Sequence, residues 1–242
     1  MSNSSNLIGR KSDVVLGYYG EPVKVTHALF SAKNAQAYTT RPLFIIMHGW
    51  GSNETDLAAI MRYVAPFNDY VALRAPIELS AADNAYSWFH DAVPVGEDLD
   101  YDAFAACNAI QNWVTENIED SREIVLMGFS QGGMLSTHML RVFPERYRAA
   151  INLSGFIAMG EISECVPADN RLAEMEKPVF FGYGDKDEII PRYELFAASA
   201  WLEENTWLTL KHYPTLDHAV GVQEFNDIKQ WLIMNGISSG MI

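Results

Sequence analysis

The stretch that decides the fold is Ile124-Val125-Leu126-Met127-Gly128-Phe129-Ser130-Gln131-Gly132-Gly133. Its first four residues are typical of a buried strand, G-x-S-x-G follows, and Gln131–Val142 has the pattern of a helix. A strand–turn–helix context of this kind lifts a serine hydroxyl above the end of a sheet. Gly128 and Gly132 have no side chains that would collide in so tight a turn. The stretch therefore predicts Ser130 as a nucleophile, in preference to a glycine-rich turn without chemistry.

Short apolar runs and longer helical patterns alternate around this turn, which is typical of a mainly parallel sheet with helices on both faces. The amino-terminal stretch Val14–Phe30 is expected to add one or two antiparallel edge strands. Buried strands are predicted at Leu43–Met47, Tyr70–Leu73, Ile124–Met127, Ala149–Leu153, Val179–Tyr183 and Leu208–Tyr213. Further helices are predicted around Ile110–Ile118, at Pro191–Glu204 and around Val222–Leu232, with Gly236 as a stop.

Composition restricts the partners and the compartment. The 242 residues include 17 Lys and Arg against 31 Asp and Glu, a formal net charge of −14. Such a chain would be repelled by nucleic acid and by anionic membrane surfaces. The start lacks the apolar stretch of a secretory signal, and the apolar runs are far shorter than the ~20 residues of a membrane span. We expect one cytoplasmic domain over residues 1–242, without membrane insertion or binding of nucleic acid. Cys107 and Cys165 are expected to be incidental thiols.

The strand Leu43–Met47 runs into His48-Gly49-Trp50-Gly51-Ser52. A strand followed by H-G-x-G places a backbone N–H at an oxyanion hole. The backbone N–H groups of Trp50 and Gln131 are therefore the predicted donors, and neither side chain is expected to matter. His48 precedes the serine, so it is expected to shape the loop rather than act as the base.

The catalytic acid is expected in the loop Gly184–Pro191, because the order along the chain is serine, acid, histidine. This loop has too few ligands in the right places for a calcium site of the EF-hand type. Asp187 is the predicted acid from the motif geometry, and Asp185 is expected to support the turn.

Of the six histidines, only two follow the acid loop. His212 lies within the predicted strand Leu208–Tyr213, where a packed or edge histidine is the ordinary interpretation. His218 lies in the loop between that strand and the last helix, from which it could reach both Ser130 and Asp187. His218 is therefore the predicted base.

Two long connections, Arg74–Tyr101 and Ser154–Lys177, leave the carboxyl ends of predicted strands, where open α/β sheets bind ligands. Apolar side chains in them are predicted to wall a substrate pocket: Trp88, Phe89, Phe156 and Ile157. The alternative is that they pack beneath their own loops as small satellite cores.

With these motifs in place, the chain resembles the phospholipase/carboxylesterase family of α/β-hydrolases, which includes acyl-protein thioesterases and small bacterial carboxylesterases. The resemblance covers about Leu43 to Leu232. It rests on the segments IIMHGWGSNETDL, RAP followed by YSWFH, GFSQGG, GDKDEIIP and DHAVGVQEFNDIKQWL. Two positions depart from the family: His90 stands where Asp is frequent, and Trp50 is bulkier than usual.

The resemblance implies an α/β-hydrolase fold with a mainly parallel central sheet and a minimal cap or none. It implies the triad Ser130, Asp187 and His218, with no metal and no cofactor. The expected function is a serine carboxylesterase acting on small to medium acyl esters, and a homodimer is compatible with the family. Two alternatives are an acyl-protein thioesterase or lysophospholipase with the same triad, and a catalytically silent binding homologue.

Overall fold

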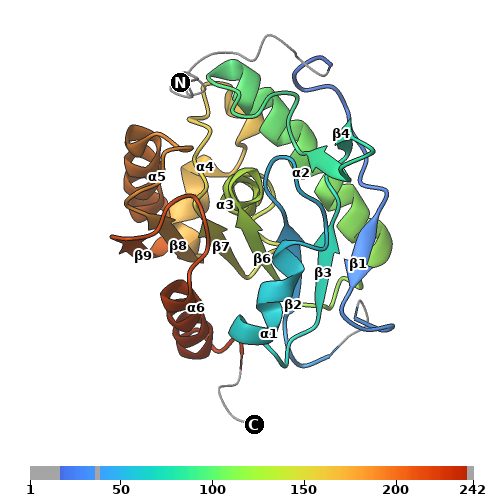
Figure 1. Cartoon of the computed structure of the whole chain (residues 1–242), viewed down its shortest axis with the longest axis vertical. Helices are drawn as coiled ribbons and strands as arrows, with labels where there is room; N and C mark the ends of the chain where they lie inside the picture. The colour runs from blue at the N-terminus through green and yellow to red at the C-terminus, as the bar shows by residue number, and fades with distance from the viewer. Residues whose placement is uncertain (1–16, 36–38, 239–242) are drawn as a thin grey trace.

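The computed structural model describes residues 17–35 and 39–238. Its centre is a seven-stranded sheet in the order β1-β3-β2-β6-β7-β8-β9 (Figure 1). Every neighbouring pair is parallel except β1 with β3, which is antiparallel. The strands are β1 (Ala28–Phe30), β2 (Leu43–Met47), β3 (Tyr70–Leu73), β6 (Ile124–Phe129), β7 (Ala149–Leu153), β8 (Pro178–Gly184) and β9 (Trp207–Tyr213).

All six predicted buried strands are present, three of them with the predicted ends. The stretch Val14–Phe30 contributes one antiparallel edge strand, β1, while residues 14–16 lie outside the described residues. The mainly parallel sheet of an α/β-hydrolase is thus confirmed.

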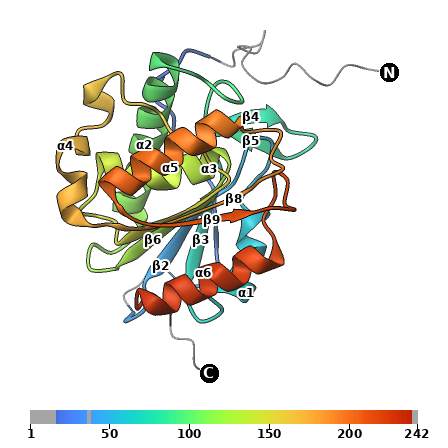
Figure 2. The same cartoon turned by 90° about the vertical axis from the view of Figure 1, so that its left-hand side faces the viewer.

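Helices cover both faces of the sheet, as Figure 2 shows with α2, α3 and α5 on one side and α1 and α6 on the other. The predicted helix Gln131–Val142 is α3, with the predicted ends. Pro191 precedes the first residue of α5 instead of opening the helix. The other helices are α1 (Met61–Val64), α2 (Glu97–Asn117), α4 (Asp169–Leu172), α5 (Arg192–Asn205) and α6 (Val222–Met234).

The two faces of the sheet have separate hydrophobic cores because alternate residues of a strand point to opposite sides. In β2, Leu43, Ile45 and Met47 pack into the core beneath α2 and α3. Phe44 and Ile46 pack into the second core, which includes residues of α1 and α6. Burial on both faces explains why these strands are continuous apolar runs.

The two long connections contain short elements that the sequence did not predict. Arg74–Tyr101 holds an antiparallel pair, β4 (Ile77–Ser80) and β5 (Ala85–Ser87), before α2 begins. Ser154–Lys177 holds α4 and two 3₁₀ turns, at Ser163–Cys165 and Ala173–Met175. A further 3₁₀ turn, Leu57–Ile60, precedes α1. Segments of three or four residues are too short to show a hydrophobic period. No large cap covers the described part of the fold, and no helix within it is long and apolar enough to span a bilayer.

Candidate active site

Ser130 joins β6 to α3 in a backbone conformation that residues other than glycine rarely adopt, with φ 55° and ψ −118°. Its backbone N–H donates to the carbonyl oxygen of Leu153 in β7 at 2.8 Å, which holds the turn against the sheet. A Cβ atom at Gly128 would lie 1.9 Å from the carbonyl oxygen of Gly132, and one at Gly132 would lie 2.1 Å from that of Met47. Both glycines are therefore required by the turn, as the motif predicts.

Asp187 and His218 meet directly. Nδ1 of His218 lies 2.7 Å from Oδ2 of Asp187, and the Asp187 side chain is fully buried. The other carboxylate oxygen accepts the N–H groups of Ile189 and Ile190, both at 2.9 Å. Asp187 is thereby fixed by its own loop, while its second oxygen accepts a hydrogen bond from the Nδ1–H of His218. With that proton on Nδ1, Nε2 of His218 is the proton acceptor of the ring.

The rejected candidates form a separate pair. Nδ1 of His212 lies 3.1 Å from Oδ2 of Asp185, and the His212 side chain is 60% exposed. The acid loop and the segment of residues 212–218 thus share two His–Asp contacts, and the less exposed of the two is Asp187–His218.

A backbone hydrogen bond joins the loop that carries His218 to the acid loop. The N–H of Lys186 donates to the carbonyl oxygen of Leu216 at 2.9 Å. The imidazole of His218 lies against the ring of Phe129, the residue before Ser130, with ring centroids 4.7 Å apart. No hydrogen bond joins Ser130 to His218 among the described residues; contacts of this kind are often long before substrate binds.

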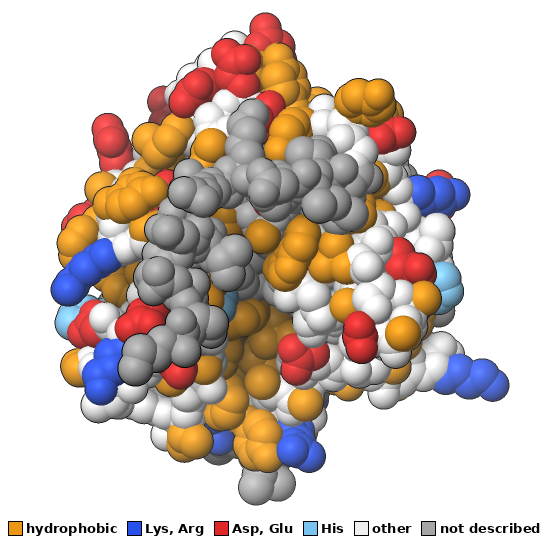
Figure 3. All heavy atoms as spheres, turned by 45° about the horizontal axis from the view of Figure 1, so that its top comes forward, with side chains coloured by type: hydrophobic (Ala, Val, Ile, Leu, Met, Phe, Trp, Pro, Cys, Tyr) orange, Lys and Arg blue, Asp and Glu red, His pale blue; other side chains and the backbone are white. Residues whose placement is uncertain are grey.

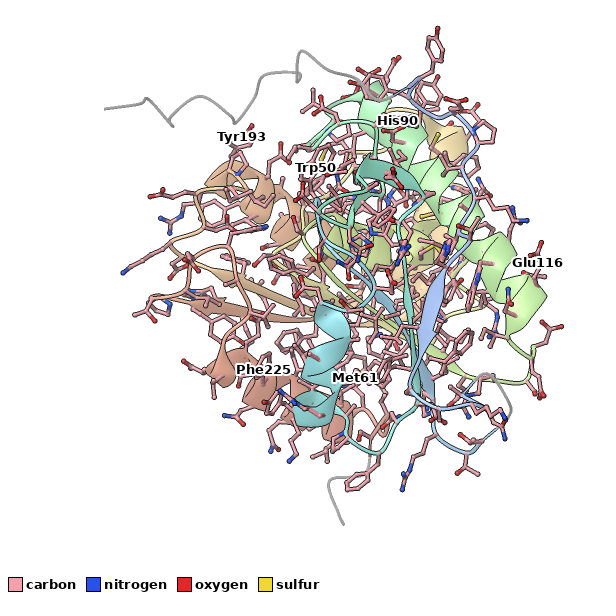
Figure 4. All side chains as sticks on the ribbon, turned by 45° about the vertical axis from the view of Figure 1, so that its right-hand side comes forward. Trp50, Met61, His90, Glu116, Tyr193 and Phe225 are labelled. Atoms are coloured by element: carbon pink, nitrogen blue, oxygen red, sulfur yellow. The ribbon has the colours of Figure 1, made fainter. Side chains whose placement is uncertain are left out.

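The predicted oxyanion loop lies against the nucleophile. A Cβ atom at Gly49 would be 3.3 Å from the Cβ of Ser130. Within the described chain, neither the Trp50 N–H nor the Gln131 N–H has a hydrogen-bond acceptor. The Trp50 side chain is 39% exposed, and Figure 4 shows it at the same end of the molecule as Tyr193 and His90. The geometry brings Trp50, Gln131 and Ser130 to one end of the sheet.

His48 shapes this loop, as predicted. Both of its ring nitrogens are occupied by hydrogen bonds to backbone groups, so it does not serve as the base. Its Nδ1 donates to the carbonyl oxygen of Gly49 at 2.8 Å, and its Nε2 accepts the Ala75 N–H at 3.0 Å. Burial lowers the pKa of His48 to about 4, so the ring is neutral near pH 7. The carbonyl oxygen of His48 in turn accepts the indole N–H of Trp88 at 2.9 Å.

The side chain of Gln131 has a role that the sequence interpretation missed. Its Oε1 accepts the hydroxyl of Ser87 and the N–H of Trp88, both at 3.1 Å. Its Nε2 donates to the carbonyl oxygens of Asp91 and Ala92, at 3.1 and 3.0 Å. The buried amide therefore ties the long connection Arg74–Tyr101 to the nucleophile turn. The signal was a polar residue with a long side chain between Ser130 and Gly132, and only the fold shows its partners.

His90, the departure from the family pattern, is hydrogen-bonded to a buried carboxylate. Its Nδ1 lies 2.9 Å from Oδ1 of Asp102, and its backbone N–H donates to Oδ2 at 2.8 Å. Gly20 donates its N–H to the same carboxylate at 2.8 Å. The pair therefore joins the amino-terminal segment to α2.

The predicted pocket residues lie together in the core on the α2 side of the sheet: Trp88, Phe89, Phe156 and Ile157, each 5% exposed or less. Phe89 and Phe156 meet edge to face across the two long connections, with centroids 6.4 Å apart. All four therefore belong to the main core rather than to separate satellite cores beneath their own loops. A contact with substrate stays a prediction for all four.

The described residues hold no group of His, Cys, Asp and Glu side chains that could bind a metal ion. Cys107 and Cys165 are both free and buried, and burial raises the pKa of both thiols.

Comparisons with known proteins identify the family and the fold of the chain. The model of the phospholipase/carboxylesterase family matches residues 32–235. Acyl-protein thioesterase 1 of Kluyveromyces lactis is 24% identical over 215 residues, which cover 82% of this chain and 93% of the yeast protein. The same enzyme of Cryptococcus neoformans is 25% identical over 248 residues, 88% of this chain and 98% of its own.

Solved structures share the fold. The Bacillus cereus carboxylesterase superposes with a TM-score of 0.67 at 20% identity, over 86% of this chain and 93% of its own. Acyl-protein thioesterase 2 of Zea mays superposes with a TM-score of 0.69 at 17% identity, over 86% and 98%. The chain belongs to the phospholipase/carboxylesterase family of α/β-hydrolases and is a serine hydrolase of carboxylic esters.

Proposed function

We propose that this chain is a carboxylesterase that hydrolyses small to medium acyl esters with Ser130 as nucleophile, His218 as base and Asp187 as orienting acid. The observation that carries the proposal is the 2.7 Å contact between the buried carboxylate of Asp187 and Nδ1 of His218, whose ring packs on Phe129 next to the strained turn of Ser130. A fixed Nδ1 proton leaves Nε2 to take the proton of a serine hydroxyl.

The reaction has two steps. Nε2 of His218 takes the proton of Ser130 as its oxygen attacks the ester carbonyl, and the protonated imidazole then returns that proton to the departing alcohol. Water, deprotonated by His218, releases the acid from the acyl-enzyme and restores Ser130. Asp187 stabilises the imidazolium in both steps without taking its proton.

The N–H groups of Trp50 and Gln131 are the proposed donors to the oxyanion. Gln131 follows Ser130 directly, and Gly49, the residue before Trp50, packs against Ser130. Neither N–H has an acceptor among the described residues. Preorganised donors of this kind lower the barrier by several kcal/mol, about 3–4 for a single donor.

The proposed limit on acyl length follows from packing. The apolar residues beneath the oxyanion loop fill the core, and the indole of Trp88 is also held there by its hydrogen bond to the carbonyl oxygen of His48. A long acyl chain would have to displace them or lie along the surface. One face has a hollow with hydrophobic side chains on its floor (Figure 3), a surface on which a short acyl group could lie.

A second candidate is thioester hydrolysis by the same residues, favoured by the relatives that are named acyl-protein thioesterases. Purified protein assayed on p-nitrophenyl esters from C2 to C12, beside an acyl-thioester of matched length, separates the two. Highest kcat/KM on C2–C6 esters supports the proposal. Highest kcat/KM on a long-chain thioester supports the second candidate.

A further inference from the structure

Glu224, in the first turn of α6, is a buried carboxyl group that the proposed reaction does not use. Its residue is 0% exposed, and its Oε1 has no hydrogen-bond partner in the described part of the chain. Its Oε2 accepts only a long bond, 3.4 Å, from the N–H of Gly221. The next residue, Phe225, marks this turn of α6 in Figure 4. A polar atom buried without a partner costs free energy, so its position requires an explanation.

The carboxyl group rests directly on strand β8. A Cβ atom at Gly182 would lie 2.2 Å from Oε1 of Glu224. Two residues further along the strand, and therefore on the same face, a Cβ atom at Gly184 would lie 2.2 Å from the carbonyl oxygen of Leu216. The two glycines thus leave a strip of β8 backbone without side chains. The Glu224 carboxyl group and Leu216, at the start of the loop that carries His218, lie side by side on this strip.

This strip connects the acid to the base. Strand β8 continues into the loop that carries Asp187, while the loop of residues 216–221 carries His218. The start of that loop is held by the bond from Lys186 to Leu216, 2.9 Å long. Its end, at Gly221, is held by Glu224.

We infer that Glu224 is a positioning residue: its carboxyl group, seated on Gly182, holds the loop of residues 216–221 so that His218 stays against Asp187. The inference rests on the proposed function of His218 as base.

The surroundings of the Glu224 carboxyl group favour its uncharged form. Burial raises the pKa of Glu224 to about 8, and the nearby carboxylate of Asp227 adds to this rise, while the Gly221 N–H opposes it. The other titratable group facing it is Tyr213 of β9, whose hydroxyl donates to Asp227 at 3.1 Å. The ammonium of Lys211 lies 3.8 Å from Asp227. The described contacts of Glu224 include no cation, so its ionisation would place a buried charge against the strip.

The direction of the pH effect follows. The folded pKa lies above the ordinary 4.5, so this group's contribution to stability is complete below that value and is lost as pH rises through about 8. At about pH 9 roughly nine-tenths of the carboxyl groups would be ionised. If only the protonated form seats the loop, kcat/KM should fall about tenfold there.

The test compares the wild type with Glu224→Gln, which keeps the shape and cannot ionise. The matched control is Glu203→Gln, the same change at an exposed position of α5. On p-nitrophenyl butyrate, the wild type and the control should lose about tenfold in kcat/KM between pH 7 and pH 9, and Glu224→Gln should keep most of its activity. Coincident pH profiles for all three proteins would overturn the inference.

A second readout does not depend on turnover. Hydrogen exchange of the peptide covering residues 214–221 should be faster in the wild type than in Glu224→Gln at pH 9, and equal at pH 6. Equal exchange at both values would contradict the seating role. If Ser130→Ala retained activity, the proposed function itself would be wrong, whatever the pH profiles showed. If Ser130→Ala is inactive and the profiles coincide, only the role of Glu224 fails.

Discussion

Oδ2 of Asp187 and Nδ1 of His218 lie 2.7 Å apart although 31 positions separate them in the chain. The contact exists because strand β8 ends beside the loop that precedes α6, and the two loops are joined by the Lys186–Leu216 bond. A second pair lies in the same two segments, where Nδ1 of His212 is 3.1 Å from Oδ2 of Asp185.

The first prediction separates these two acids. Asp187→Asn should lower kcat by about 10⁴-fold, because an amide at this place favours the wrong tautomer of His218. Asp185→Asn should cost far less, since its partner His212 is exposed. Steady-state kinetics on one ester decide, and the reverse order would assign the acid to Asp185.

The second prediction concerns the Gln131 side chain. Gln131→Ala removes the four hydrogen bonds that tie the connection to the nucleophile turn. We expect a loss of about 1–3 kcal/mol in the free energy of unfolding and a raised KM. The control is Gln230→Ala at an exposed position of α6. Equal denaturation midpoints for the two variants would contradict this role.

The sequence predicted the sheet and the nucleophile turn well because their causes are local. Continuous apolar strands such as Ile124–Phe129 and the clashes avoided at Gly128 and Gly132 can be inferred from neighbouring residues. The partners of Gln131 and Glu224 could not be predicted, because they lie on segments that only the folded sheet brings together.

The third prediction concerns pH and His48. Its folded pKa of about 4 lies below the ordinary 6.5, so unfolding takes up a proton between these values and stability falls as pH drops through this window. The loss should be at most about 3 kcal/mol. In His48→Gln, which has a donor and an acceptor but does not titrate there, the slope of unfolding free energy against pH should be smaller than in the wild type. The exposed control His27→Gln should keep the wild-type slope. Identical slopes in both variants would refute the assignment.

The fourth prediction concerns the buried aromatic residues. If Trp88 and Phe156 touch the acyl group, Trp88→Ala and Phe156→Ala should shift chain-length preference by roughly 1–3 kcal/mol per methylene. Both changes should also lower the melting temperature, because the side chains are 1% exposed. A C2 to C12 ester series measured beside melting curves tests both effects. An unchanged chain-length profile with a lowered melting temperature would make them core residues only.

The most direct test of the account is covalent labelling and turnover with Ser130→Ala. The wild type should take up one fluorophosphonate group on Ser130, seen by mass spectrometry of the digested protein. The variant should melt as the wild type does, take up no label and lose esterase activity by about 10⁴-fold or more. A folded Ser130→Ala protein that keeps most of its activity, or a wild type labelled at another residue, would contradict the assignment of Ser130 as the nucleophile.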